Sequence, residues 1–301
     1  MPGQAAAAGS RRVFGHAVAV LAALSYATGT ALAVLAYRDG ASPLSVTTLR
    51  TGFALIAIFA LIRLTGGAWR MEGRDRRLVL ALGLVLAVQS ISHYIGVKLL
   101  PLALATLIFY LFPFYIAFGA HLTRQERITP GIIAALAVAF GGLVLVFDVG
   151  GSMKIDPPGV AFALLAGITF AILALAVQPP LRRVADTRAV SLHLHVTTVA
   201  AFVLACIVLD EFPLPHTRAG WVAFLTVPFF YTAAVVAIYY SIAAIGPVRM
   251  SLVTNLEPVA AIFYGFVLLD QVLSWLQLAG AALIVGAIIA VRLGQARPAS
   301  G

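Results

Sequence analysis

Residues 78–122 read LVLALGLVLAVQSISHYIGVKLLPLALATLIFYLFPFYIAFGAHL, in which two almost uncharged apolar stretches meet at Pro101. A helix needs roughly 20 apolar residues to cross the hydrocarbon core of a bilayer, because each backbone polar group must find its partner inside the helix. Both stretches reach this length. The segment therefore predicts two consecutive membrane-spanning helices joined by a very short loop.

The same pattern extends along the whole chain, and it predicts an all-α polytopic membrane protein with ten transmembrane helices. Of the 301 residues, 62% are hydrophobic and 10% are charged, which excludes a soluble domain of ordinary composition. The predicted spans are Val13–Tyr37, Pro43–Leu64, Leu78–Leu100, Leu102–Leu122, Pro130–Val149, Gly159–Val177, Ala189–Leu209, Gly220–Ile245, Pro247–Leu269 and Val272–Val291.

The cationic residues lie in every second loop, and this predicts the orientation. With the N-terminus in the cytoplasm, Arg50 lies inside a span and most other cations face the cytoplasm, as the positive-inside rule requires. Both termini are then cytoplasmic. The net charge of +9 does not indicate nucleic-acid binding, because no cationic cluster exceeds a short loop. The cations left on the outside are Arg38, Lys98, Lys154 and Arg218.

Two halves of the chain resemble each other. Three residues of the fourth span align with residues of the ninth at a constant offset of 145, and the proline is identical in both. Glu126 precedes Gly142 by 16 residues, as Asp270 precedes Gly286. We predict five-helix units at 13–149 and 159–291, a linker at 150–158, and cytoplasmic tails at 1–12 and 292–301. The recurring pairs are Thr106 and Ser251, Tyr110 and Asn255, and Pro113 and Pro258.

An odd number of spans in each unit places the two units upside down relative to each other. Inverted repeats are typical of secondary carriers, which alternate between inward-open and outward-open states around a site near the midplane. The alternative is that duplication only enlarged the helix bundle. Prolines at matching depth in spans four and nine predict bends, which serve either gating or packing.

Residues 100–113 followed by Glu126, and their counterpart at 255–258 followed by Asp270, resemble the EamA-type modules of the drug/metabolite transporter superfamily. The resemblance covers nearly the whole chain. It implies two inverted five-helix halves around a cavity lined mainly by spans one, three, four, six, eight and nine, and export or exchange of small metabolites. Arg50 looks like the common arginine of that module, and His193 or His195 stands at the equivalent place in the second half.

Charged groups inside hydrocarbon are costly, so Arg50 and Glu257 are candidate substrate-binding residues. They would neutralise each other directly or through substrate. For Arg50, the alternatives are a side chain that extends to the outer surface and a structural pairing with carboxylates of the loops. For Glu257, which precedes Pro258, the alternative is a structural ion pair.

Span three places Gln89 and His93 on one helical stripe with Ser92 and Gly96, and this stripe cannot face lipid. It lines a cavity or packs against other helices. His93 could also couple protons to transport. The other candidate binding residues are Tyr26, Tyr110, Phe170, Tyr239 and Asn255.

We therefore predict a multi-pass secondary transporter of the bacterial inner membrane that exports small metabolites, with amino acids or related compounds as substrates. An intramembrane enzyme or a passive channel is the alternative. No GxSxG, HExxH or GxxxxGK[ST] motif occurs in the sequence, so no enzyme, metal or cofactor is expected. Small-residue faces at Ala137 and Gly141 and at Gly286 and Ala290 predict helix packing, in a monomer or a homodimer.

Reporter fusions test the orientation. An enzyme active only in the cytoplasm is expected to be active when fused to either end of the chain, because both termini are predicted to lie there. A C-terminal fusion that is active only outside the membrane would overturn the predicted topology.

Overall fold

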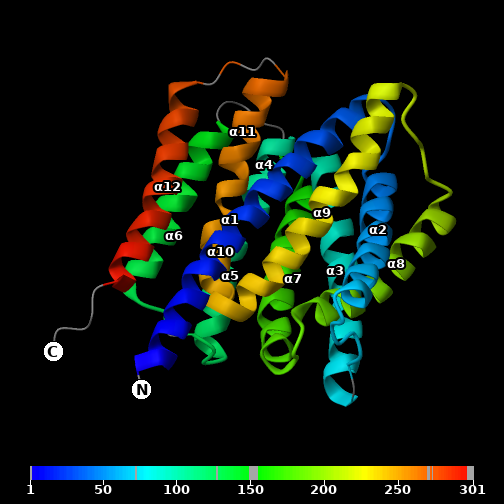
Figure 1. The fold of residues 1–301 in the computed structure, drawn as a ribbon. Helices are drawn as coiled ribbons and strands as arrows, with labels where there is room; N and C mark the ends of the chain where they lie inside the picture. The colour runs from blue at the N-terminus through cyan, green and yellow to red at the C-terminus, as the bar shows by residue number, and fades with distance from the viewer. Residues whose placement is uncertain are drawn as a thin grey trace.

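The computed structural model describes residues 2–71, 73–126, 128–148, 155–269, 272 and 274–296, and every regular element in these ranges is a helix. Figure 1 shows the helices as a single bundle. In chain order they are α1 (Pro2–Arg38), α2 (Pro43–Leu64), α3 (Gly73–Leu99), α4 (Leu102–Phe109), α5 (Phe112–Leu122), α6 (Pro130–Phe147), α7 (Pro157–Arg183), α8 (Thr187–Leu209), α9 (Arg218–Ile245), α10 (Pro247–Thr254), α11 (Leu256–Leu269) and α12 (Trp275–Ala296).

The prediction of an all-helical polytopic membrane protein is confirmed. Eight segments are long and apolar enough to cross a membrane when α4 and α5 are taken together as Leu102–Leu122. The helices α10 and α11 occupy the predicted ninth span, and the apolar part of α12, Trp275–Val291, occupies most of the tenth.

Helix starts follow local capping chemistry. Pro43, Pro130 and Pro157 each occupy the first position of a helix, where the missing N–H of proline costs nothing. The first helix begins earlier than Val13, because the alanine-rich segment before it has high helix propensity. Asp270, Lys154, Val149 and parts of the predicted linker and C-terminal tail lie outside the described residues.

Two of the predicted spans are broken in their middle. One is divided between α4 and α5 at Tyr110, and the other between α10 and α11 at Asn255. Proline lacks an N–H and its ring displaces the carbonyl four residues earlier, so Pro113 and Pro258 each prevent a continuous helix. Both breaks lie close to the prolines for which bends were predicted.

The two predicted halves interleave rather than sit apart. The helix α1 packs along α9, α3 along α7, and α6 along α12, and each pair joins one half to the other. In Figure 1, α1 begins and α12 ends at the lower end of the bundle. We call this the arginine-rich end, because α2 and α7 end there with the exposed Arg63, Arg182 and Arg183.

The helices α6 and α12 touch at glycines other than those predicted. A Cβ added to Gly142 would lie 2.6 Å from the carbonyl oxygen of Gly280, whereas one added to Gly141 or Gly286 would meet nothing within 4 Å. Within a single copy of the chain, the prediction that Gly141 and Gly286 make the packing contact is therefore wrong. Neighbouring residues on a helix point about 100° apart, so only one of the pair Gly141 and Gly142 can face α12.

A methyl group at the crossing should destabilise the bundle. We expect Gly280→Ala to lower the free energy of unfolding by about 1–3 kcal/mol, because the added Cβ overlaps the Gly142 backbone. Thermal unfolding of the purified protein in detergent measures this. The control Gly286→Ala should keep the melting temperature, and an equal loss in both variants would contradict the assigned crossing.

Candidate substrate site

A cavity of about 470 Å³ lies between α1, α3, α4, α6, α11 and α12. Arg38 and Leu102 are exposed on its rim, so it reaches the surface at the end opposite the arginine-rich one. Helices α4 and α11, the halves of the two broken spans on this side, form facing walls. The polar lining residues are Thr30, Arg38, His93, Thr106, Tyr110, Glu257 and Gln277.

Glu257 is the only carboxylate among the described lining residues of this cavity. It stands in the first turn of α11, where the positive end of the helix favours an anion. The hydroxyls of Tyr110 and Thr30 lie within hydrogen-bonding reach of its carboxyl group. Tyr110 and Thr30 line the same cavity as Glu257.

His93 faces the same cavity from α3. Its ring packs against Phe109, with 4.8 Å between the ring centroids. Its Nδ1 is buried and has no hydrogen-bond partner among the described residues. An unpaired buried ring nitrogen is costly, so this atom is available to a ligand group in the cavity.

A second, smaller cavity of about 30 Å³ brings together Tyr26 of α1, Phe170 of α7 and Tyr239 of α9. This volume is about that of one water molecule. The rings of Tyr26 and Tyr231 meet edge to face, with centroids 6.0 Å apart. This smaller cavity is therefore an aromatic chamber too narrow for a metabolite in this conformation.

Arg50 is held by an aromatic face. Its guanidinium carbon lies 4.6 Å from the centroid of the Tyr231 ring, within cation–π range. Its Nε is buried and finds no hydrogen-bond partner among the described residues. The ion pairs found in the described part of the chain are Arg183–Asp75 and Arg188–Asp186, so Arg50 and Glu257 do not pair directly.

A buried histidine orients Tyr231 beneath Arg50. The Nδ1 of His195 lies 2.7 Å from the Ser191 carbonyl oxygen, which can only accept, so Nδ1 carries the proton. Its Nε2, 3.2 Å from the Tyr231 hydroxyl, therefore accepts from it. His193 instead lies on the outer face of α8, in an apolar groove. The two histidines therefore point to different faces of α8.

Three of the predicted site residues line neither cavity: Arg50, Gln89 and Asn255. Gln89 is buried, and its Oε1 accepts from the Ser90 hydroxyl at 3.2 Å. Asn255 is buried at the break between α10 and α11, and its Oδ1 has no partner. Tyr26, Phe170 and Tyr239 share the small cavity, whereas His93, Tyr110 and Glu257 share the large one.

Several residues of the large cavity are absent from the sequence-based candidates. Thr30 follows Tyr26 by four residues and so lies on the same face of α1, a spacing that could have pointed to it. Arg38 and Gln277 stand at helix ends, where charged and polar residues are common, so the sequence carried no signal for them.

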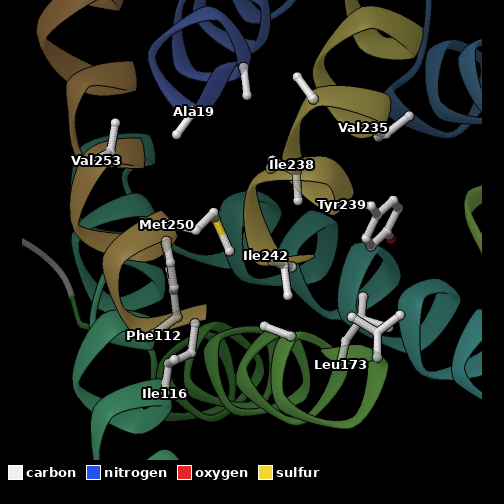
Figure 2. Packing of buried hydrophobic residues seen from close by; sticks show 14 of the residues in the cluster. Ala19, Phe112, Ile116, Leu173, Val235, Ile238, Tyr239, Ile242, Met250 and Val253 are labelled. Atoms are coloured by element: carbon white, nitrogen blue, oxygen red, sulfur yellow. The ribbon is translucent and has the colours of Figure 1, made fainter. Parts of the chain in front are cut away.

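Toward the arginine-rich end of the bundle, α5 packs against α10. Figure 2 shows Phe112 and Ile116 of α5 facing Met250 of α10, and each of these side chains is at most 3% exposed. The halves of the two broken spans at this end thus pack together, whereas their partners α4 and α11 flank the large cavity.

Glu126 links the loop after α5 to α10 at this end. It lies in the loop after α5, and its carboxylate accepts from the Val248 N–H in the first turn of α10 at 3.4 Å. Burial raises the pKa of the Glu126 carboxyl, and the charges of Arg249 and Arg182 oppose that shift. Gly246 has φ +86°, and a Cβ there would overlap the Glu126 carboxylate. The loop of one half thereby caps a helix of the other.

A metal site is not formed by the described residues, in which no three His, Cys, Asp or Glu side chains come together. The large cavity offers hydroxyls, one imidazole, one amide and single charges of each sign. Such groups suit reversible binding of a small polar molecule.

Comparisons with known proteins agree with this arrangement. A crystal structure matches with a TM-score of 0.77 and 18% identity over 96% of this chain and 99% of the other, which shows a shared fold. An uncharacterized transporter from Archaeoglobus fulgidus is 23% identical over 277 residues, or 92% of this chain and 95% of its own length. The model of the EamA-like transporter family matches twice, at residues 13–148 and 157–293. The chain therefore belongs to the EamA-like transporter family, and it is a membrane transporter of the drug/metabolite type.

Proposed function

We propose that this protein is a secondary transporter that exports small polar metabolites across the bacterial inner membrane by alternating access. The observation that carries the proposal is the state of the two broken spans. Their halves α5 and α10 pack together at the arginine-rich end, whereas α4 and α11 flank an open cavity at the other end. With the arginine-rich end in the cytoplasm, the structure is the outward-open state.

The proposal includes ten spans arranged as two inverted five-helix repeats, 13–149 and 159–291. The two family matches cover nearly these ranges and support the duplication. Breaks at Tyr110 and Asn255, at matching depth in the two units, support it further. In the opposite state, α5 and α10 separate and α4 and α11 close over the site.

Amino acids or related zwitterions are the proposed substrates. Glu257 offers an anion at the cavity wall, and Arg50 is a nearby cation with no carboxylate partner in the described chain. Tyr26, Phe170 and Tyr239 would form aromatic walls when the small chamber widens, and Gln89 and Asn255 would supply amide groups. His93 and Tyr110 would bind polar substrate groups in the cavity, and His93 would carry the proton if transport is proton-coupled.

Counterflow in proteoliposomes tests the site. The protein should exchange labelled for unlabelled amino acid, and Glu257→Gln, His93→Ala and Arg50→Lys should each lower the initial rate at least about tenfold, the equivalent of about 1.4 kcal/mol. The control Asp210→Asn removes an exposed carboxylate far from both cavities at a left-handed position that asparagine tolerates.

Unimpaired counterflow by all three variants would remove the site assignment. The same exchange assay distinguishes a carrier from a passive channel and from an intramembrane enzyme. A passive channel would equilibrate the label without accumulating it against unlabelled substrate, and an intramembrane enzyme would convert the compound.

The contact between Glu126 and α10 gives a second test. Glu126→Ala removes the acceptor for the α10 amide, so α10 should leave α5 more often. In a Cys206→Ser background, a cysteine replacing the buried Ser251 should then react faster with a membrane-impermeant thiol reagent added on the cytoplasmic side. Unchanged labelling in Glu126→Ala would contradict the role of this contact.

A further inference from the structure

A groove that shares no lining residue with the two cavities lies between α6 and α12. The two helices touch at Gly142 and Gly280, whereas a Cβ added to Gly286 would meet nothing within 4 Å. The space between them has a volume of about 550 Å³. Small and apolar side chains line it, chiefly Gly131, Ala134, Val138, Gly286 and Ala290. The open space beside Gly286 is part of this groove.

One charged side chain enters this apolar groove. Arg249, in the first turn of α10, reaches its wall at the arginine-rich end. Its Nη1 donates to the Ile245 carbonyl oxygen at 3.3 Å, and its buried Nε has no hydrogen-bond partner in the part of the chain that the structure describes. Glu126 influences it electrostatically, but no ion pair joins the two in the described chain. The guanidinium therefore keeps donors for an external anion.

The groove also has a positive helix end beside Arg249. Thr129 caps the N-terminus of α6 and lines the groove at the same end. Helix N-termini favour negative charge, so both features point to an anion at one end of an apolar channel. A phosphate group joined to hydrocarbon chains has this distribution of charge. Basic pockets between transmembrane helices bind such head groups.

We propose that this groove binds an anionic phospholipid, with its phosphate at Arg249 and an acyl chain between α6 and α12. A second copy of the chain is the competing occupant, since small residues allow close helix contact. A twofold interface would bring the same surface of both copies together, and therefore two Arg249 side chains into one seam. Like charges repel each other there, whereas a phospholipid brings an anionic phosphate to Arg249.

Native mass spectrometry of the full chain, titrated with phosphatidylglycerol or phosphatidylcholine in detergent, tests the charge. Arg249→Gln should weaken phosphatidylglycerol binding about fivefold, which corresponds to about 1 kcal/mol for one arginine at a lipid surface. It should weaken phosphatidylcholine binding less, because the choline cation of that lipid offsets the charge of its phosphate. The matched control Arg63→Gln removes an exposed arginine from the same end of the bundle and should change neither lipid.

A steric pair tests the groove independently of Arg249. Gly286→Leu fills the groove, and Gly141→Leu adds the same side chain at another open position, outside the groove. Only Gly286→Leu should reduce binding of both lipids. Unchanged lipid binding in Arg249→Gln and Gly286→Leu would overturn the proposal. Loss of a dimer in Gly286→Leu without loss of lipid would assign the groove to a second copy. Neither result depends on the transport assay.

Discussion

The absence of water in the hydrocarbon core is the constraint on which this structure depends. A carbonyl that loses its helical partner there costs several kcal/mol unless protein or a cavity surrounds it. Pro113 and Pro258 each free such a carbonyl, so the two broken spans can lie only inside the bundle. The oxygen freed at Phe109 faces Gly167 of α7, where a side chain would crowd it. A helix of the second half thus surrounds the carbonyl that Pro113 frees in the first half.

Arg50 and Glu257 are each stabilised by their own neighbours and not by each other. Arg50 rests on an aromatic ring that a histidine orients, and Glu257 is held by hydroxyl groups and a helix terminus. A direct ion pair between them would neutralise both charges and leave little for a substrate. Arg50 and Glu257 are thus stabilised separately, and of the two only Glu257 lines the large cavity.

The small residues of α6 and α12 act in two different ways. Gly142 and Gly280 allow the backbones to touch, so they close the bundle where the helices cross. Gly286 and its neighbours face open space and leave a groove instead. The same residue type therefore either packs helices or opens a surface, and the crossing point decides which.

The sequence by itself determined the helical class and the approximate limits of the spans, because these follow from local hydropathy. Its prolines predicted bends near the two breaks but did not determine the breaks, since α9 stays continuous around Pro228. It also picked out His93, Tyr110 and Glu257, since polar groups in apolar helices stand out. Only the tertiary structure decided that Arg50 meets Tyr231 rather than Glu257, that Gln89 and Asn255 line neither cavity, and that Gly142 rather than Gly141 makes the contact. These outcomes depend on how each helix is rotated about its axis, and packing between distant segments sets that rotation.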